Sequence, residues 1–172
     1  MFEKLTLKAR IRAIVVGAIV MLVAAGTVAV VGQTQSTAGF KGMLGSEVEL
    51  ARTAVEIQYL SLGLRRYEKD TFLNVDKPKK VEGYSKKFDT VLGRIKDRVK
   101  TAGALATTAD EKAVIREIAT SVGAYEKGFR TVQADVLSGA ITTPQAGNKA
   151  MKPFKNSIRS LGESGDRLVE LR

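Results

Sequence analysis

The chain contains no histidine, cysteine or tryptophan, and only three prolines among its 172 residues. Without cysteine there is no disulfide framework and no thiolate chemistry. Without histidine there is no imidazole for acid–base catalysis, for a zinc site or for haem ligation, and no histidine to accept a phosphate. No paired-acid motif offers carboxylate catalysis instead. We therefore expect a protein that is not an enzyme and that uses no cofactor or metal.

Charge is absent from residues 13–40, and the run AIVVGAIVMLVAAGTVAVVG at 13–32 is apolar throughout. Roughly 20 such residues span a bilayer as one helix. Residues 1–12 carry four Lys/Arg and one acid, which by the positive-inside rule places the N-terminus in the cytoplasm. We expect a cytoplasmic tail at 1–12, a transmembrane helix at 13–32 and an extracytoplasmic domain at 33–172, with the lipid bilayer as a partner.

Two other interpretations of the apolar run are open. A secretory signal peptide has a shorter apolar core and a small-residue cleavage site; residues 24–26 (AAG) fit such a site, but the run continues past it. A buried core helix is disfavoured, because the run has no polar face at all.

Acidic residues are the minority, with 18 Asp/Glu against 28 Lys/Arg and a net charge of +10. A basic domain suits nucleic acid, anionic lipid or small anionic ligands. The expected location and the lack of a nucleic-acid-binding motif argue against nucleic acid. The remaining alternatives are a small anion and a basic, solvated helical surface.

Helical periodicity and cap signals divide the outer part into four segments. The first helix is expected to end near Asn74, and Pro78 opens a second that ends near Gly103. Thr108 and Glu111 form a capping box for a third, which ends before Gly139. A fourth begins at 142–144 (TTP), with a kink at Pro153. The expected fold is all-α, an N-terminal transmembrane helix continuing into an up-down-up-down four-helix bundle. The heptad still runs at Arg172, so we expect a second span to follow.

The first helix carries the densest charged run, LRRYEKD at 64–70. The apolar residues expected to face the core on this helix include Val48, Val55, Tyr59, Leu62 and Leu73. Between Leu62 and Leu73 the same helical face carries Arg66 and Lys69. Buried charges are costly unless they are paired or bound. The residues are explained either by internal pairing, such as Arg66 with Asp70, or by an anion site.

Bases on the other helices lie at the depth of Arg66, eight residues from the turn. They are Lys86 and Lys87 on the second helix, Arg130 on the third, and Lys152, flanked by Lys149 and Lys155, on the fourth. Such a level would attract a carboxylate or phosphate. Lys86 lies opposite its own seam, so we expect it to face solvent.

Two segments carry a family resemblance, RRYEKDTFLN at 65–74 and GAITTPQAGNKAM at 139–151, followed by Pro153-Phe154-Lys155. They resemble bacterial methyl-accepting chemotaxis receptors with helical-bundle sensor domains, and the resemblance covers the membrane span and the whole outer region. It implies a homodimeric sensor in the bacterial inner membrane that binds amino acids or organic acids through arginines on the first helix. In a dimer, Arg66 and Lys69 would instead lie at the interface between the copies. The candidate ligand-binding residues are Arg65, Arg66, Lys69, Arg130, Lys152, Thr142 and Thr143.

Other functions fit the same sequence. One is the input domain of a different signalling protein, such as a sensor histidine kinase. Another is a non-sensing, membrane-anchored interaction bundle. An enzyme is disfavoured because no nucleophile or base constellation is present.

Overall fold

A computed structural model of the chain describes Met21 and residues 45–171. The chain divides into two compact units, Met1–Gly45 and Ser46–Arg172. The expected cytoplasmic tail at 1–12 and membrane span at 13–32 lie outside the described residues, apart from Met21. Within the described part, none of the helices has the length and apolar character that a bilayer crossing requires. All regular structure there is helical, which confirms the all-α class.

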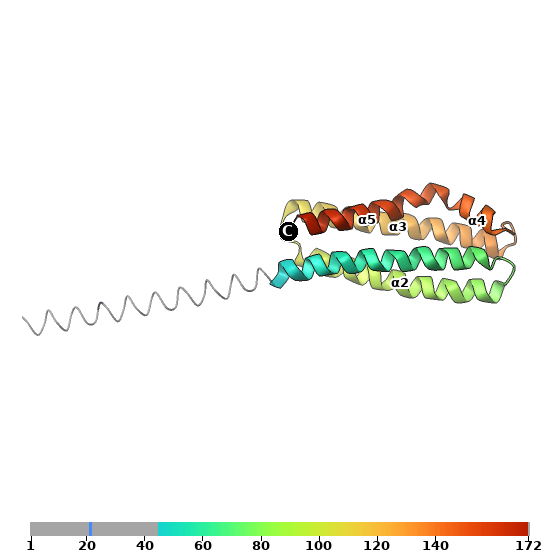
Figure 1. Ribbon diagram of the computed structural model, residues 1–172, viewed down its shortest axis with the longest axis horizontal. Coiled ribbons are helices and arrows are strands. Elements are labelled where there is room, and N and C mark those ends of the chain that lie inside the picture. Colours follow the sequence, from blue (N-terminus) through green and yellow to red (C-terminus); the bar gives the residue numbers. More distant parts are fainter. Residues whose placement is uncertain (1–20, 22–44, 172) are drawn as a thin grey trace, which may run out of the picture. The chain divides into compact units, whose positions relative to one another are not determined.

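The second unit is built from helices joined by short connections. The first helix covers residues 45–73 of the described part. It is followed by α2 (Pro78–Leu105), α3 (Ala109–Leu137), α4 (Pro144–Ala150), the short 3-10 helix η1 (Lys152–Phe154) and α5 (Lys155–Glu170). Direction reverses after the first helix, after α2 and after α3, while α4, η1 and α5 run on in one direction. The C-terminal end of α5 therefore lies beside the start of the first helix (Figure 1).

Local cap signals in the sequence explain these boundaries. The Thr108 side chain accepts from the backbone N–H of Glu111, and the Glu111 carboxylate accepts from the Thr108 N–H, so the predicted capping box is confirmed. Thr143 caps α4 by accepting from the Ala146 N–H. Gly139 has a φ of 77°, a conformation in which glycine avoids the Cβ penalty that other residues meet.

The predicted fourth helix is interrupted at Pro153, where a kink was expected, and the interruption is a complete break. It is broken into α4, η1 and α5, with Pro153 in the 3-10 turn. Proline lacks an N–H and its ring clashes with the carbonyl four residues earlier, so an α-helix cannot continue through it without a break. The turn packs closely on α3, because a Cβ at Gly128 would lie 2.2 Å from the Phe154 ring.

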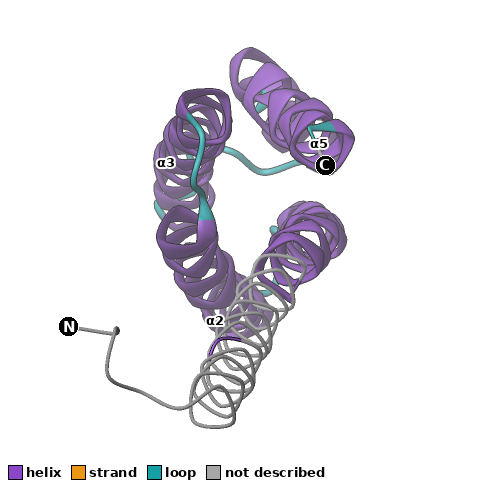
Figure 2. Cartoon of the chain, turned by 90° about the vertical axis from the view of Figure 1, so that its left-hand side faces the viewer, coloured by secondary structure: helices purple, strands orange, loops and turns teal. Residues whose placement is uncertain are grey.

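A continuous apolar core lies between the helices. The predicted seam of α3 is confirmed, since all its members are buried: Ile115, Ile118, Val122, Tyr125, Phe129, Val132 and Val136. The rings of Phe88 and Phe129 stack with centroids 3.9 Å apart. Contacts place α3 against both α2 and α5, and Figure 2 shows it between them.

The first helix also has a neighbour on each side. It meets α2 through an ion pair of 2.9 Å between Glu56 and Arg98. It meets α5 through Gln58, which donates to the carbonyl of Gly162 and to the Asp166 carboxylate. The four long segments therefore form a closed set of neighbouring pairs.

The seam predicted for the first helix was wrong. Val48, Val55, Tyr59, Leu62 and Leu73 are between 54 and 72% exposed. The core is instead lined by a face of mixed character, which comprises Leu50, Thr53, Ala54, Ile57, Leu60, Ser61, Leu64, Glu68, Thr71 and Phe72. The core face includes small and polar residues, whereas the exposed face carries large aliphatic residues at helical spacing. The exposed face therefore gives the stronger periodic signal in the sequence.

Candidate functional site

A small pocket lies between the first helix and the start of α5. Its volume is about 160 Å³, and it is lined by Arg65, Glu68, Lys69, Lys155, Ile158 and Arg159. On each helix the two cationic residues are four apart, a spacing that places them on one helical face. The structure therefore brings two of the predicted residues, Arg65 and Lys69, together with Lys155, which the sequence placed only as a flank of Lys152.

Glu68 forms the inner wall of this pocket and is only 2% exposed. Its Oε2 accepts a hydrogen bond from the hydroxyl of Tyr125, which is itself fully buried on α3. Burial raises the pKa of Tyr125, and the charge and hydrogen bond of Glu68 raise it further, against a smaller opposing effect of Arg65. The tyrosine thus remains a donor at physiological pH and holds the glutamate in place.

The remaining oxygen, Glu68 Oε1, is buried and accepts no hydrogen bond from any residue that the structure describes. Lys69 Nζ lies 3.2 Å away as an ion-pair contact, but its hydrogen bond goes to Asn148 Oδ1 on α4. We take the contact as charge attraction without hydrogen-bond geometry. Oε1 is therefore buried in the wall of the pocket, and the positive charge of Lys69 offsets its burial.

Lys155 approaches the same amide oxygen from the other side of the pocket. Its Nζ donates to Asn148 Oδ1 over 2.7 Å. Desolvation lowers the pKa of Lys155, and repulsion by Lys69 lowers it further; Arg65 and Arg159 act in the same direction, and Glu68 opposes them. The side chain is thus held among like charges with one carboxylate to offset them.

Charge around the pocket is unbalanced. Four cationic side chains lie with a single carboxylate among the lining residues. Like charges that converge on a partly enclosed space repel one another, and an anion of small size would relieve that repulsion. Arginine forks and ammonium groups are the usual donors to carboxylates and phosphates.

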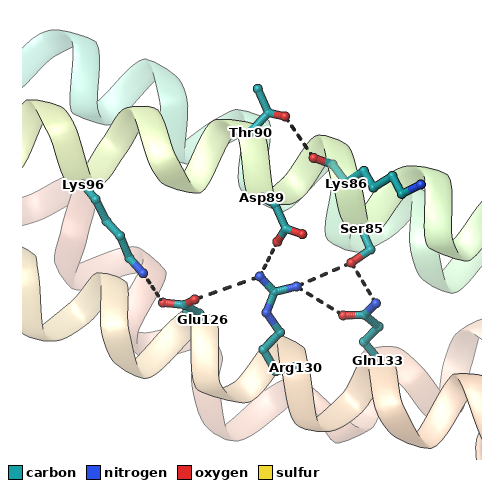
Figure 3. Close-up of polar contacts among 8 residues, drawn as sticks. All are labelled: Ser85, Lys86, Asp89, Thr90, Lys96, Glu126, Arg130 and Gln133. Atoms are coloured by element: carbon teal, nitrogen blue, oxygen red, sulfur yellow. Dashed lines mark hydrogen bonds and ion pairs between the residues drawn. The ribbon is translucent and has the colours of Figure 1, made fainter.

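Arg130, another predicted site residue, belongs to a different cluster, between α2 and α3 (Figure 3). It pairs with Asp89 and Glu126, and its guanidinium donates to Ser85 and Gln133. Glu126 also pairs with Lys96 at 2.7 Å. Two cations there face two carboxylates, so the cluster is complete without a ligand, and Arg130 does not line the pocket.

The other predicted residues lie outside the pocket. The Arg66 side chain is 75% exposed and pairs with Asp70 at 3.8 Å, which is the internal pairing considered as an alternative. Lys152 and Thr142 are exposed, and the Thr143 hydroxyl oxygen serves as the α4 cap. The structure therefore does not bring Arg66, Arg130 and Lys152 into the pocket that Arg65 and Lys69 line.

Two pocket residues were missed from the sequence, Glu68 and Arg159. Glu68 lies at the seven-residue spacing from Ser61 and four residues after Leu64, so the correct core face of the first helix would have identified it. Arg159 follows Lys155 by four residues, a like-charge pair that is unfavourable on a helix without a compensating anion.

The described residues contain no group of carboxylates able to hold a metal ion. Comparison of the chain with protein-family models, with curated proteins and with solved structures finds no match.

Proposed function

We propose that this chain is the ligand-sensing region of a transmembrane receptor of the methyl-accepting chemotaxis type, and that its ligand is a small anion. The observation that carries the proposal is the pocket at Arg65, Lys69, Lys155 and Arg159, which has three more cations than carboxylates. The apolar run at 13–32, which precedes the first helix, supports a membrane anchor.

The position of the pocket suits a sensor. Its walls come from the first helix and α5. The start of the first helix and the C-terminal end of α5 lie side by side (Figure 1). A ligand that contacts both changes the relative stability of their packing arrangements, and small helix shifts are a common means of signalling. We propose that the helices form an up-down-up-down four-helix bundle, which the reversal of direction and the closed set of neighbouring pairs support.

We also propose that the protein is a homodimer, with a second copy of the first helix covering the exposed apolar stripe. Val48, Val55 and Leu62 are seven residues apart, and Tyr59 lies four after Val55, which is the heptad pattern of paired helices. Large apolar residues are at least half exposed along this stripe. Contiguous patches of this kind mark interfaces.

Thermal unfolding of the full chain in detergent, with and without phosphate and small carboxylates at constant ionic strength, tests the ligand site. A ligand at 100 times its Kd adds about 2.7 kcal/mol, or roughly 5–15 °C for a domain of this size. The shift should be lost in Lys155→Gln and kept in Lys152→Gln, a lysine three residues away that does not line the pocket. A shift that survives in both variants, or no shift with any anion, would contradict the proposed site.

A distance measurement tests the sensing step. The chain has no cysteine, so spin labels at Arg52→Cys and Glu170→Cys report on the first helix and α5. Dilution of the labelled chain with unlabelled chain restricts the measured distance to one copy of the proposed dimer. Binding should move the distance distribution by about 1–2 Å, the size of known signalling shifts. Saturated binding with an unchanged distribution would indicate a binding or interaction protein that does not signal through these helices.

A further inference from the structure

We infer that the ligand of this site is an amphiphilic carboxylate: its carboxylate lies between Lys69 and Lys155, and its apolar ring or short chain lies in a second pocket beside them. The inference rests on the proposed anion site and adds the chemical class of its ligand. It comes from an apolar pocket that adjoins the charged one.

This second pocket lies between the end of the first helix and α4. Its volume is about 260 Å³, its surface is mostly apolar, and it is lined by Lys69, Phe72, Leu73, Pro144, Gln145 and Asn148. The Phe72 ring is buried and lies so close to α4 that a Cβ at Gly147 would be 2.9 Å from it. Leu73 is 64% exposed. The pocket therefore has a packed apolar floor and a side that is open to solvent.

The apolar pocket and the charged pocket share a boundary. Lys69 lines both of them. Asn148 lines the apolar pocket, and its Oδ1 accepts a hydrogen bond from Lys155, which lines the charged one. A molecule that binds between the two lysines therefore has an apolar surface directly beside it.

Asn148 Oδ1 marks the point at which this boundary holds an acceptor oxygen. The ammonium groups of Lys69 and Lys155 both donate to it, and for Lys155 it is the one acceptor among the residues that the structure describes. A neutral amide oxygen leaves the repulsion between two ammonium groups uncompensated, whereas a carboxylate offsets it and forms stronger hydrogen bonds with both. Because Asn148 is exposed, a ligand carboxylate can displace its oxygen and accept both bonds.

The size and surface of the second pocket define the rest of the ligand. A cavity of about 150 Å³ is known to hold benzene, so a pocket of about 260 Å³ has room for a phenyl ring or a chain of about five or six carbons. Phosphate or acetate would use the lysines and leave the apolar surface in contact with water. A combination of apolar walls with a few polar groups that fix orientation is typical of ligand sites.

A chain-length series tests the inference. Acetate, butyrate and hexanoate are titrated calorimetrically into the full chain in detergent, and the heats measured with protein-free micelles are subtracted. A fully buried methylene strengthens binding about fourfold. Because the pocket is open on one side, we expect at least about twofold for each methylene, and hexanoate at least tenfold tighter than acetate. Adipate, which has a second carboxylate in place of the apolar end, should bind more weakly than hexanoate.

A polar substitution in the apolar pocket should affect the chain and not the carboxylate. In Leu73→Asn, the ratio of hexanoate to acetate affinity should fall at least threefold, while acetate binds as it does to the wild type. Leu137→Asn is the matched control, since Leu137 is 44% exposed and lines neither pocket. It should keep the wild-type ratio.

Substitutions of Asn148 test where the carboxylate binds. Asn148→Asp places a carboxylate of the chain itself between Lys69 and Lys155, so acetate and hexanoate should both bind at least tenfold more weakly. Asn148→Ala removes the oxygen that a ligand has to displace, so both should bind at least as tightly as to the wild type. Wild-type affinity in Asn148→Asp would overturn the placement of the carboxylate.

The outcomes separate this inference from the proposed function. Equal affinities for acetate, butyrate and hexanoate, all lost in Lys155→Gln, would overturn the amphiphilic ligand while the anion site stands. A chain-length dependence that is the same in Leu73→Asn and the wild type would overturn the assignment of the apolar pocket. Absence of binding by every anion, phosphate included, would contradict the proposed site itself.

Discussion

Two clusters of charged side chains on this protein differ in their balance of positive and negative charge. The Arg130 cluster joins α2 to α3 with two cations and two carboxylates, and each charge has an opposite partner (Figure 3). The pocket cluster joins the first helix to α5 with four cations and one carboxylate, and Glu68 Oε1 there accepts no hydrogen bond from a described residue. Charge balance, rather than the number of bases, distinguishes a structural network from a candidate ligand site.

The largest expected effect comes from removing the Tyr125 hydroxyl, which holds Glu68 in the wall of the pocket. Tyr125→Phe removes the hydroxyl that donates to Glu68 Oε2 and leaves a second buried carboxylate oxygen without a donor. We expect the free energy of unfolding to fall by about 1–3 kcal/mol. Denaturant titration measures it. Tyr84→Phe, on a half-buried ring, should change it by less than about 0.5 kcal/mol, and equal effects of the two variants would refute the anchoring role.

The balanced cluster should lose stability when a charge is removed. Arg130→Gln unpairs Asp89 and one side of Glu126, and removes a cation 5.7 Å from the centre of the Phe88 ring. Because these groups are partly exposed, we expect a loss of only about 0.5–1 kcal/mol, and less at high salt. A stability gain in denaturant titration would show that the cluster is not balanced.

The unbalanced cluster should respond with the opposite sign. Lys155→Gln removes one of four converging cations, so in low-salt, phosphate-free buffer we expect the unliganded protein to gain a few tenths of a kcal/mol. Added salt screens the same repulsion, so the gain should shrink as ionic strength rises. Destabilisation comparable to that of Arg130→Gln would mean that the pocket lysine is a structural partner rather than part of an excess of charge.

The smallest effect is a pH dependence from Lys155. Its folded-state pKa lies below the ordinary value of 10.5, so between the two values the unfolded chain binds more protons than the folded one. The free energy of unfolding therefore rises with pH up to about 10.5. Below the folded-state pKa, Lys155 is protonated in both states and destabilises the folded protein by its full amount. The wild-type minus Lys155→Gln difference in unfolding free energy should rise from pH 8 to 10. A difference in unfolding free energy that does not change with pH would argue against repulsion of Lys155 by the neighbouring cations.

Much of the fold was predictable because its signals are local. The Thr108–Glu111 capping box, the Thr143 cap and the glycine at 139 each act within a few residues, and the α3 seam has large apolar residues on one face only. The prediction of the core face failed for the first helix because two of its faces carry apolar residues. The core face also contains alanine, serine, threonine and Glu68, whereas the exposed face carries larger aliphatic residues. Periodicity identifies the more apolar face, which here is the one that we propose meets another copy.

The candidate site was predictable in part for the same reason. Arg65 and Lys69 were recognisable from the charged run, but which neighbours they share depends on how the first helix is rotated about its axis. The wrong seam pointed to Arg66 instead of Glu68. On the last segment Lys155 and Arg159 flank Ile158, which lines the pocket with them, whereas Lys152 lies exposed in the 3-10 turn.

The adjacent pair Arg65 and Arg66 gives the most direct test of the central claim, because Arg65 lines the pocket, whereas Arg66 does not and pairs with Asp70. Titration of phosphate into the full chain should show at least a tenfold loss of affinity for Arg65→Gln, as expected for a lost charged hydrogen bond of about 1.5–3 kcal/mol. Arg66→Gln should lose less than about threefold, through long-range charge alone. Equal losses, or a larger loss for Arg66→Gln, would contradict a site between the first helix and α5.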